Sequence, residues 1–167
     1  MIRLLLLCLL LAGCATSPPS AQRPSVAEIS TFAFTGRIAV RQGETRHYVN
    51  IDWRHAADSD EILLNTPLGQ GLAELTRNAS GARLLLADQR HYEAQDWGAL
   101  SEQVFGFRLP LEASARWLLG ELTNTEGWRI TVIERENSAP YALPTIIELE
   151  RDDIFVRLKI DEWSTVQ

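Results

Sequence analysis

The chain has 167 residues, of which 46% are hydrophobic and 23% are charged, and its formal net charge is −6. This length predicts one domain around a single core, and the apolar content with five tryptophans excludes a disordered chain. The acidic balance argues against nucleic-acid binding, since such proteins present a basic surface to phosphates. No apolar run reaches the roughly 20 residues that a membrane-spanning helix needs.

Residues 1–13 have the pattern of an export signal. Arg3 supplies a positive start, residues 4–12 form an apolar run, and small residues precede Cys14. The sequence LAGC at 11–14 resembles the bacterial lipobox, which implies that Cys14 receives lipid and becomes the first residue of the mature chain. The alternative is an ordinary secretory signal that ends in cysteine. Because Cys8 leaves with the signal, the mature chain is expected to hold one thiol and no internal disulfide.

Residues 14–30 are predicted to form the lipidated cysteine and a flexible tether, followed by a folded domain over 31–167. The segment 15–25 reads ATSPPSAQRPS, and such a composition is typical of a semi-extended linker. Ala15 stands where an Asp holds lipoproteins of this kind in the inner membrane, so outer-membrane sorting is expected. Removal of residues 1–13 deletes one arginine and no acid, which moves the net charge from −6 to −7.

Alternation of apolar and polar residues predicts six strands in the first half of the domain. The first two strands pair as a hairpin around the turn at 42–44. The apolar face of the first strand carries Phe34 and Ile38, and the apolar face of the second carries Val49, Ile51 and Trp53. Evenly spaced strands of this kind favour a barrel or a strongly curved sheet. The predicted strands are Phe32–Arg41, His47–Trp53, Glu61–Asn65, Leu72–Thr76, Arg83–Leu86 and Arg90–Glu93.

Two helices and three strands are predicted to follow. Asp96 can cap a helix that runs through Phe105 and stops at Gly106, and Pro110 stands at the start of a second helix, Leu111–Leu119. This order of elements predicts an α+β fold in which helices lie across an antiparallel sheet. The three final strands are expected at Trp128–Glu134, Thr145–Glu150 and Ile154–Ile160.

The sequence lacks the motifs of catalytic, metal and phosphate sites: H-E-x-x-H, paired C-x-x-C, G-x-S-x-G and a glycine-rich phosphate loop. We therefore predict no catalytic residue, no metal and no cofactor, and a protein that is not an enzyme. His47 lies on an apolar strand face and is expected to be structural. His55 is expected to be solvated at the start of a polar loop, in which Asp58, Asp60 and Glu61 form a solvated acidic turn.

The loop at 65–71 places an apolar side chain at its tip. Pro67 fixes φ, Gly69 permits a positive φ, and Leu68 stands between them. Loop tips normally carry polar residues. Leu68 is therefore expected either to contact an apolar surface outside the protein or to fold back onto the core.

Several stretches together resemble the LolB family of outer-membrane lipoproteins. They are FTGR at 34–37, LLNTPLG at 63–69, LPL at 109–111, RWLLG at 116–120 and RLKIDEW at 157–163, and with the lipobox they follow one another along most of the chain. The resemblance implies an incomplete antiparallel β-barrel whose helices cover a hydrophobic cavity. It also implies that this cavity accepts the acyl chains of lipoproteins from the periplasmic carrier LolA. A protruding loop, here Pro67, Leu68 and Gly69, then helps to insert them into the outer membrane.

The resemblance leaves the details of the cavity open. Only seven residues separate Gly120 from Trp128, where the family has a longer connection, so a narrower or more open cavity is expected. The chain is expected to act as a monomer on the periplasmic face of the outer membrane of a Gram-negative bacterium, without a nucleic-acid partner. Two alternatives stand beside this function: a lipid-anchored binding protein for another apolar ligand, and an envelope scaffold. Strand parity leads to the hypothesis that these residues line the cavity: Phe34, Ile38, Val49, Ile51, Trp53, Leu64 and Trp117.

Overall fold

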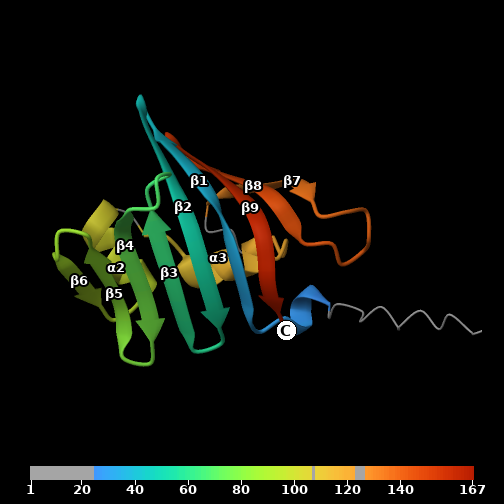
Figure 1. The fold of residues 1–167 in the computed structure, drawn as a ribbon, viewed down its shortest axis with the longest axis horizontal. Helices are drawn as coiled ribbons and strands as arrows, with labels where there is room; N and C mark the ends of the chain where they lie inside the picture. Colours follow the sequence, from blue (N-terminus) through green and yellow to red (C-terminus); the bar gives the residue numbers. More distant parts are fainter. Residues whose placement is uncertain (1–24, 107, 123–126) are drawn as a thin grey trace, which may run out of the picture.

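The structure, a computed structural model, describes residues 25–106, 108–122 and 127–167. In these residues the chain forms a nine-stranded antiparallel sheet with two helices against one of its faces (Figure 1). A short 3-10 segment, η2 (Val26–Glu28), precedes the sheet. The elements that follow are β1 (Phe32–Gln42), β2 (Thr45–Ala56), β3 (Ser59–Asn65), β4 (Gly71–Asn78), β5 (Gly81–Leu86), β6 (His91–Ala94), α2 (Trp97–Phe105), α3 (Leu111–Leu118), β7 (Arg129–Arg135), β8 (Pro144–Arg151) and β9 (Ile154–Val166).

The strand order is β6-β5-β4-β3-β2-β1-β9-β8-β7, so the three strands after the helices extend the sheet beside β1. β1 pairs along its whole length with β2 on one side and β9 on the other. The strands β6 and β7 form the two edges, and the sheet is not closed in the part of the chain that the structure describes. The predicted antiparallel sheet with few helices is confirmed, whereas the structure does not show a hydrophobic cavity.

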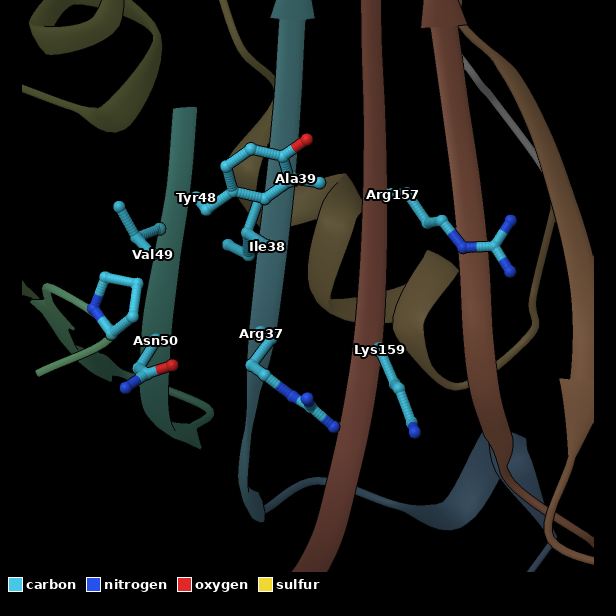
Figure 2. A pocket seen from close by; sticks show the side chains of 9 residues that line it. Arg37, Ile38, Ala39, Tyr48, Val49, Asn50, Arg157 and Lys159 are labelled. Carbon is cyan, nitrogen blue, oxygen red and sulfur yellow. The ribbon is translucent and has the colours of Figure 1, made fainter. Parts of the chain in front are cut away.

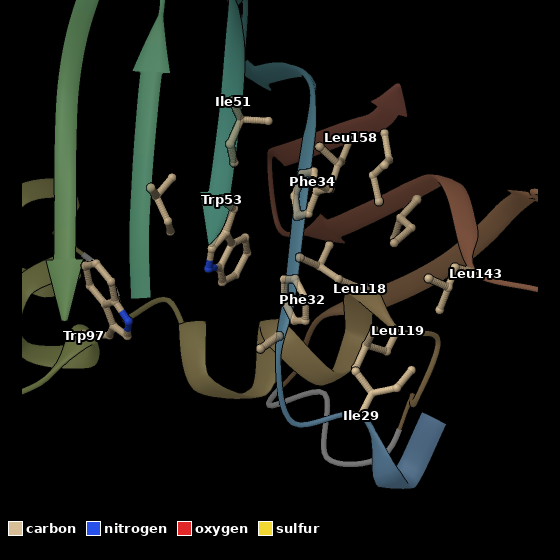
Figure 3. Packing of buried hydrophobic residues seen from close by; sticks show 14 of the residues in the cluster. Ile29, Phe32, Phe34, Ile51, Trp53, Trp97, Leu118, Leu119, Leu143 and Leu158 are labelled. Atoms are coloured by element: carbon tan, nitrogen blue, oxygen red, sulfur yellow. The ribbon is translucent and has the colours of Figure 1, made fainter. Parts of the chain in front are cut away.

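The two faces of the sheet differ in what covers them. On the helix face, as we name it, Phe34, Ile51 and Trp53 are buried in one cluster with Leu118 and Leu119 of the second helical segment (Figure 3). The open face carries the alternate side chains of the same strands. Because successive side chains of a strand point to opposite faces, the alternation in the sequence assigns each residue to its face.

Aromatic rings fill the centre of the helix face. The Phe32 ring lies 5.7 Å from that of Trp53 and 5.7 Å from that of Trp163, both edge-on. Phe34 lies 5.2 Å from Trp163, and the Trp163 indole donates to the carbonyl oxygen of Pro144 at 3.0 Å. Edge-on ring pairs of this kind stabilise a core beyond the area that they bury. They join β1, β2, β8 and β9 into one unit.

Both helices begin and end close to the predicted positions. The Asp96 side chain accepts from the backbone N–H of Ala99 at 2.7 Å, and Gly106 ends α2 with φ of 78°. The helix α3 begins after Pro110 and ends at Leu118, one residue before its predicted end. The side chains of residues 111 and 112 lie outside the description. The predicted apolar stripe is confirmed at Ala115, Leu118 and Leu119, which are buried in the core.

The nine predicted strands all occur, but the boundaries around residues 55–60 were wrong. β2 runs to Ala56 and β3 begins at Ser59, so His55 and Asp60 are strand residues rather than loop residues. At the N-terminus, the predicted signal, Cys14 and the tether up to residue 24 lie outside the described residues. The last residues of the segment predicted to be a tether pack on the domain: Ile29 is buried in the core, and the Arg116 guanidinium donates to its carbonyl oxygen at 3.1 Å. All members of the core cluster and those packed against it fall within residues 26–163.

Gly36 marks the closest approach of β1 to β9. A Cβ atom at this position would lie 2.4 Å from the carbonyl oxygen of Lys159, beside a register shift between Thr35 and Gly36. We expect Gly36→Ala to lower the free energy of unfolding by about 1–3 kcal/mol, because the strand backbones must separate. Urea unfolding followed by tryptophan fluorescence measures this loss. Thr35→Ala, on the exposed side of the same strand, is the control and should cost clearly less; an equal loss would contradict the steric explanation.

Candidate functional site

The helix face has a covered part and an open part. Beneath the helices Phe34, Ile51 and Trp53 are almost fully buried by other side chains. The β1–β2 hairpin extends beyond the helices (Figure 1), and apolar side chains there are only half-buried. The register sets them in adjacent rows, with Ile38 opposite Val49 and Val40 opposite Val156. We call this group the apolar margin; its members are Ile38, Val40, Val49, Leu64 and Val156.

The predicted lining residues therefore fall into two groups. Ile38, Val49 and Leu64 keep free apolar surface at the margin. Phe34, Ile51, Trp53 and Trp117 are buried, and the rings of Phe34 and Trp53 lie 6.0 Å apart. A ligand can reach the first group directly, whereas it reaches the second only if side chains of the helix layer move.

The helix layer, together with the residue directly before β7, contains buried donors without acceptors. In the described residues the indole nitrogens of Trp97, Trp117 and Trp128 are buried and have no hydrogen-bond partner. A buried donor left unsatisfied costs about 1–3 kcal/mol. An acceptor that enters this layer, such as an ester or amide carbonyl, therefore gains from these N–H groups.

The loop between β3 and β4 holds Leu68 away from the protein. The backbone N–H of Gly69 donates to the carbonyl oxygen of Thr66 at 2.8 Å, and Gly69 has φ of 84°, as predicted. The Thr66 hydroxyl accepts from the backbone N–H of Gln70, and the Asn50 amide donates to the Thr66 carbonyl. Leu68 is 90% exposed at the tip of this turn. Of the two readings of the loop, the one in which Leu68 folds back onto the core is wrong.

A buried ionic cluster replaces the predicted acidic turn. Asp60 accepts from the Trp53 indole at 2.9 Å and from Arg77 Nε at 2.6 Å, and it lies 2.6 Å from His55 Nδ1. Burial raises the pKa of Asp60, but the hydrogen bonds from His55, Trp53 and Arg77 outweigh it and hold that pKa below its usual value. The cluster joins β2, β3 and β4 on the helix face.

Three sequence-based expectations about polar residues are corrected by this geometry. His55 is not solvated, because it packs against the Phe32 ring at 4.7 Å and contacts Asp60. Asp60 is buried, although Asp58 beside it is exposed. His47 is exposed rather than structural, since it lies near the tip of the hairpin, where none of the described segments covers the helix face.

The described residues contain neither a cluster of potential metal ligands nor a helix with the length and apolar character to cross a membrane. The predicted lipidation site, Cys14, lies outside the residues that the structure describes. What the described geometry offers is apolar surface at the margin and one exposed leucine on a fixed loop. This arrangement defines the class of fold: an antiparallel sheet that helices cover over only part of one face, with apolar side chains accessible along the uncovered part.

The comparisons with known proteins give the family. The model of the family described as outer membrane lipoprotein LolB matches residues 30–163. The chain is 33% identical to an outer-membrane lipoprotein LolB of Azoarcus sp., over 95% of this chain and 91% of that protein. It is 34% identical to that of Dechloromonas aromatica, over 96% and 95%, and 31% identical to that of Chromobacterium violaceum, over 98% of each. The chain belongs to the LolB family, as the resemblance predicted, and this membership supports the prediction that it is not an enzyme.

Proposed function

We propose that this protein is an outer-membrane lipoprotein that accepts lipoproteins from a LolA-type carrier and inserts them into the outer membrane. Its relatives carry the name outer-membrane lipoprotein LolB. The observation that carries the proposal is Leu68, 90% exposed at the tip of a hydrogen-bonded turn. Leu68 does not belong to the core cluster, and its side chain gains about 2 kcal/mol when it leaves water and enters a membrane.

The organisation of the chain follows from this proposal. Residues 1–13 are the signal, residues 14–30 contain the lipidated Cys14 and the tether, and residues 31–167 form the acyl-chain-binding domain. The protein acts as a monomer at the periplasmic face of the outer membrane. It uses no cofactor, since transfer requires only that acyl chains prefer this protein to the carrier, and the bilayer to this protein.

Acyl chains meet the apolar margin first. Each methylene that leaves water there contributes about 0.8 kcal/mol. Deeper entry between the sheet and the helices forms the incomplete, barrel-like cavity, lined by Phe34, Ile51, Trp53 and Trp117. The unpaired indole N–H of Trp117 favours this step, because it can donate to a carbonyl of the acylated cargo.

A transfer assay tests the proposal. A radiolabelled lipoprotein bound to LolA is mixed, without membranes, with the unlipidated chain from residue 15, and the two proteins are separated on an affinity tag. The proposal predicts that the label moves to this chain. Label that stays on an active carrier of the same organism contradicts it and leaves a binding protein for another apolar ligand as the better account.

The apolar margin is tested by a substitution at two paired positions. We expect Ile38→Asn with Val49→Asn to weaken capture of the labelled lipoprotein about tenfold, because amide groups replace apolar surface that acyl chains cover. Equilibrium distribution of the label between carrier and chain measures the effect. Ala39→Asn, on the opposite face of β1, is the matched control and should leave capture unchanged. Equal losses in the two variants would remove the margin from the binding site.

A further inference from the structure

The open face of the sheet carries positive side chains at the end where the β1–β2 hairpin protrudes. The register sets them in neighbouring rows, with Arg41 opposite Arg46 and Arg37 opposite Lys159. Figure 2 shows Arg37, Arg157 and Lys159 on the side of the sheet away from the helix behind it. We call this group the cationic patch, and its members are Arg37, Arg41, Arg46, Arg157 and Lys159, with Tyr48 among them.

Three of these cations have no ion-pair partner in the described part of the chain. Arg37 pairs with Asp161 at 2.7 Å, and Arg157 pairs with Glu148. Arg46 and Lys159 form no ion pair, and the Arg41 guanidinium lies 5.5 Å from the centre of the Phe155 ring. The whole chain has a net charge of −6, so the patch is a local departure from an acidic composition. Glu44, Asp152 and Asp153 lie in the two turns at the hairpin end, outside these rows. Within the rows, Glu148 lies opposite Arg157 and Glu150 opposite Phe155, and Glu150 pairs with Arg129.

The cationic patch is continuous with the Leu68 loop. Pro67, which directly precedes Leu68, lines the same groove of about 260 Å³ as Arg37, Arg157 and Lys159. The Asn50 amide, in the row of Arg37, donates to the carbonyl oxygen of Thr66 at 3.2 Å and so fixes the loop to this face. Tyr48 is 61% exposed beside it. Tyrosine, arginine and lysine beside a loop that carries an exposed leucine form the set of side chains that is typical of a membrane interface.

We propose that the cationic patch binds the phosphates of anionic phospholipids and so presents the Leu68 loop to the bilayer. The proposal rests on the function proposed above and adds to it the lipid class that the loop region recognises. Unpaired guanidinium and ammonium groups complement the negative surface of such a membrane within a Debye length. A tether keeps the domain close to the membrane, but it does not determine which side of the domain faces the lipid. A patch beside the loop fixes which side of the domain faces the lipid.

Vesicle binding tests the patch separately from transfer. The unlipidated chain from residue 15 retains the whole core cluster and is floated with vesicles of phosphatidylcholine alone or with about a third of phosphatidylglycerol. The patch variant is Arg41→Gln, Arg46→Gln and Lys159→Gln. The control variant removes the same charge from arginines outside the patch: Arg54→Gln, Arg83→Gln and Arg108→Gln. We expect the patch variant to bind the phosphatidylglycerol vesicles about a hundredfold more weakly at low salt, since each of the three cations near such a surface contributes a factor of about five.

The control variant should bind almost as the unchanged chain does, and added salt should reduce the difference between the two variants. Equal losses in both variants, or binding that does not depend on phosphatidylglycerol, overturn the proposal. If the patch variant loses capture from the carrier instead of vesicle binding, the patch docks a protein and the proposal is wrong. Capture from the carrier without vesicles is measured in parallel, so failure of the transfer function is recognised independently.

Discussion

Replacing Leu68 with glutamate is expected to separate capture of cargo from its delivery. The side chain is 90% exposed and belongs to no core cluster, so Leu68→Glu should fold normally and accept lipoprotein from the carrier. Delivery to vesicles should fall at least tenfold, because a carboxylate at the loop tip opposes entry into the apolar part of the membrane. A two-step assay, with label first on the chain and then on vesicles, measures both steps.

The matched control for this substitution is Ile133→Glu. Ile133 is an exposed apolar residue on the edge strand β7, outside the loop and the apolar margin. It receives the same charge change and should leave both steps unaltered. If Leu68→Glu delivers cargo as fast as the unchanged chain, the loop has no part in insertion.

The second large effect is on stability. Asp60 is buried with Trp53, His55 and Arg77 as hydrogen-bond partners. Asp60→Asn should lower the free energy of unfolding at neutral pH by about 3 kcal/mol, because the partly buried Arg77 loses its charged partner. Urea unfolding measures the loss. Asp161→Asn removes a carboxylate from an exposed pair with Arg37 and should cost far less, since water screens that pair.

The pH dependence of this difference follows from the direction of the pKa shift. The pKa of Asp60 is lower in the folded chain than its ordinary value, because its hydrogen bonds outweigh the effect of burial. The folded state therefore gains stability from the ionised carboxylate above the unfolded pKa of about 3.9, and loses it as the pH falls through the folded pKa. The difference between the unchanged chain and Asp60→Asn should narrow below about pH 4. A constant difference into acid would contradict a charged Asp60.

Local patterns were sufficient to predict most of the fold. Alternation located the strands, and the capping signals at Asp96 and Gly106 located α2. The turn at Leu68 was predictable because Pro67 and Gly69 each restrict or permit a particular backbone conformation by themselves, without help from distant residues. The family pattern then supplied the arrangement of sheet and helices, which periodicity alone does not determine.

The Asp60 cluster and the cationic patch could not be predicted in this way. Asp60 is separated from Arg77 by 17 positions in the chain, and only the register of β3 with β4 makes them neighbours. Asp60 looks like a turn residue in the sequence because its neighbours Asp58 and Ser59 are polar. Likewise, Arg37 and Lys159 meet only because β9 returns beside β1. For His47, alternation gave the correct face, but the missing cover over that end of the hairpin depends on where the helices lie.

The central claim is that acyl chains of the cargo bind to the helix face, first at the apolar margin. A lipoprotein that carries a photoreactive fatty acyl chain tests this most directly. It is transferred from the carrier and irradiated, and the crosslinked peptides are identified by mass spectrometry. The account predicts crosslinks to β1, β2 and β3 at Ile38, Val49 and Leu64. Crosslinks confined to open-face residues such as Ala39 or Tyr48, with none at the margin, would contradict it.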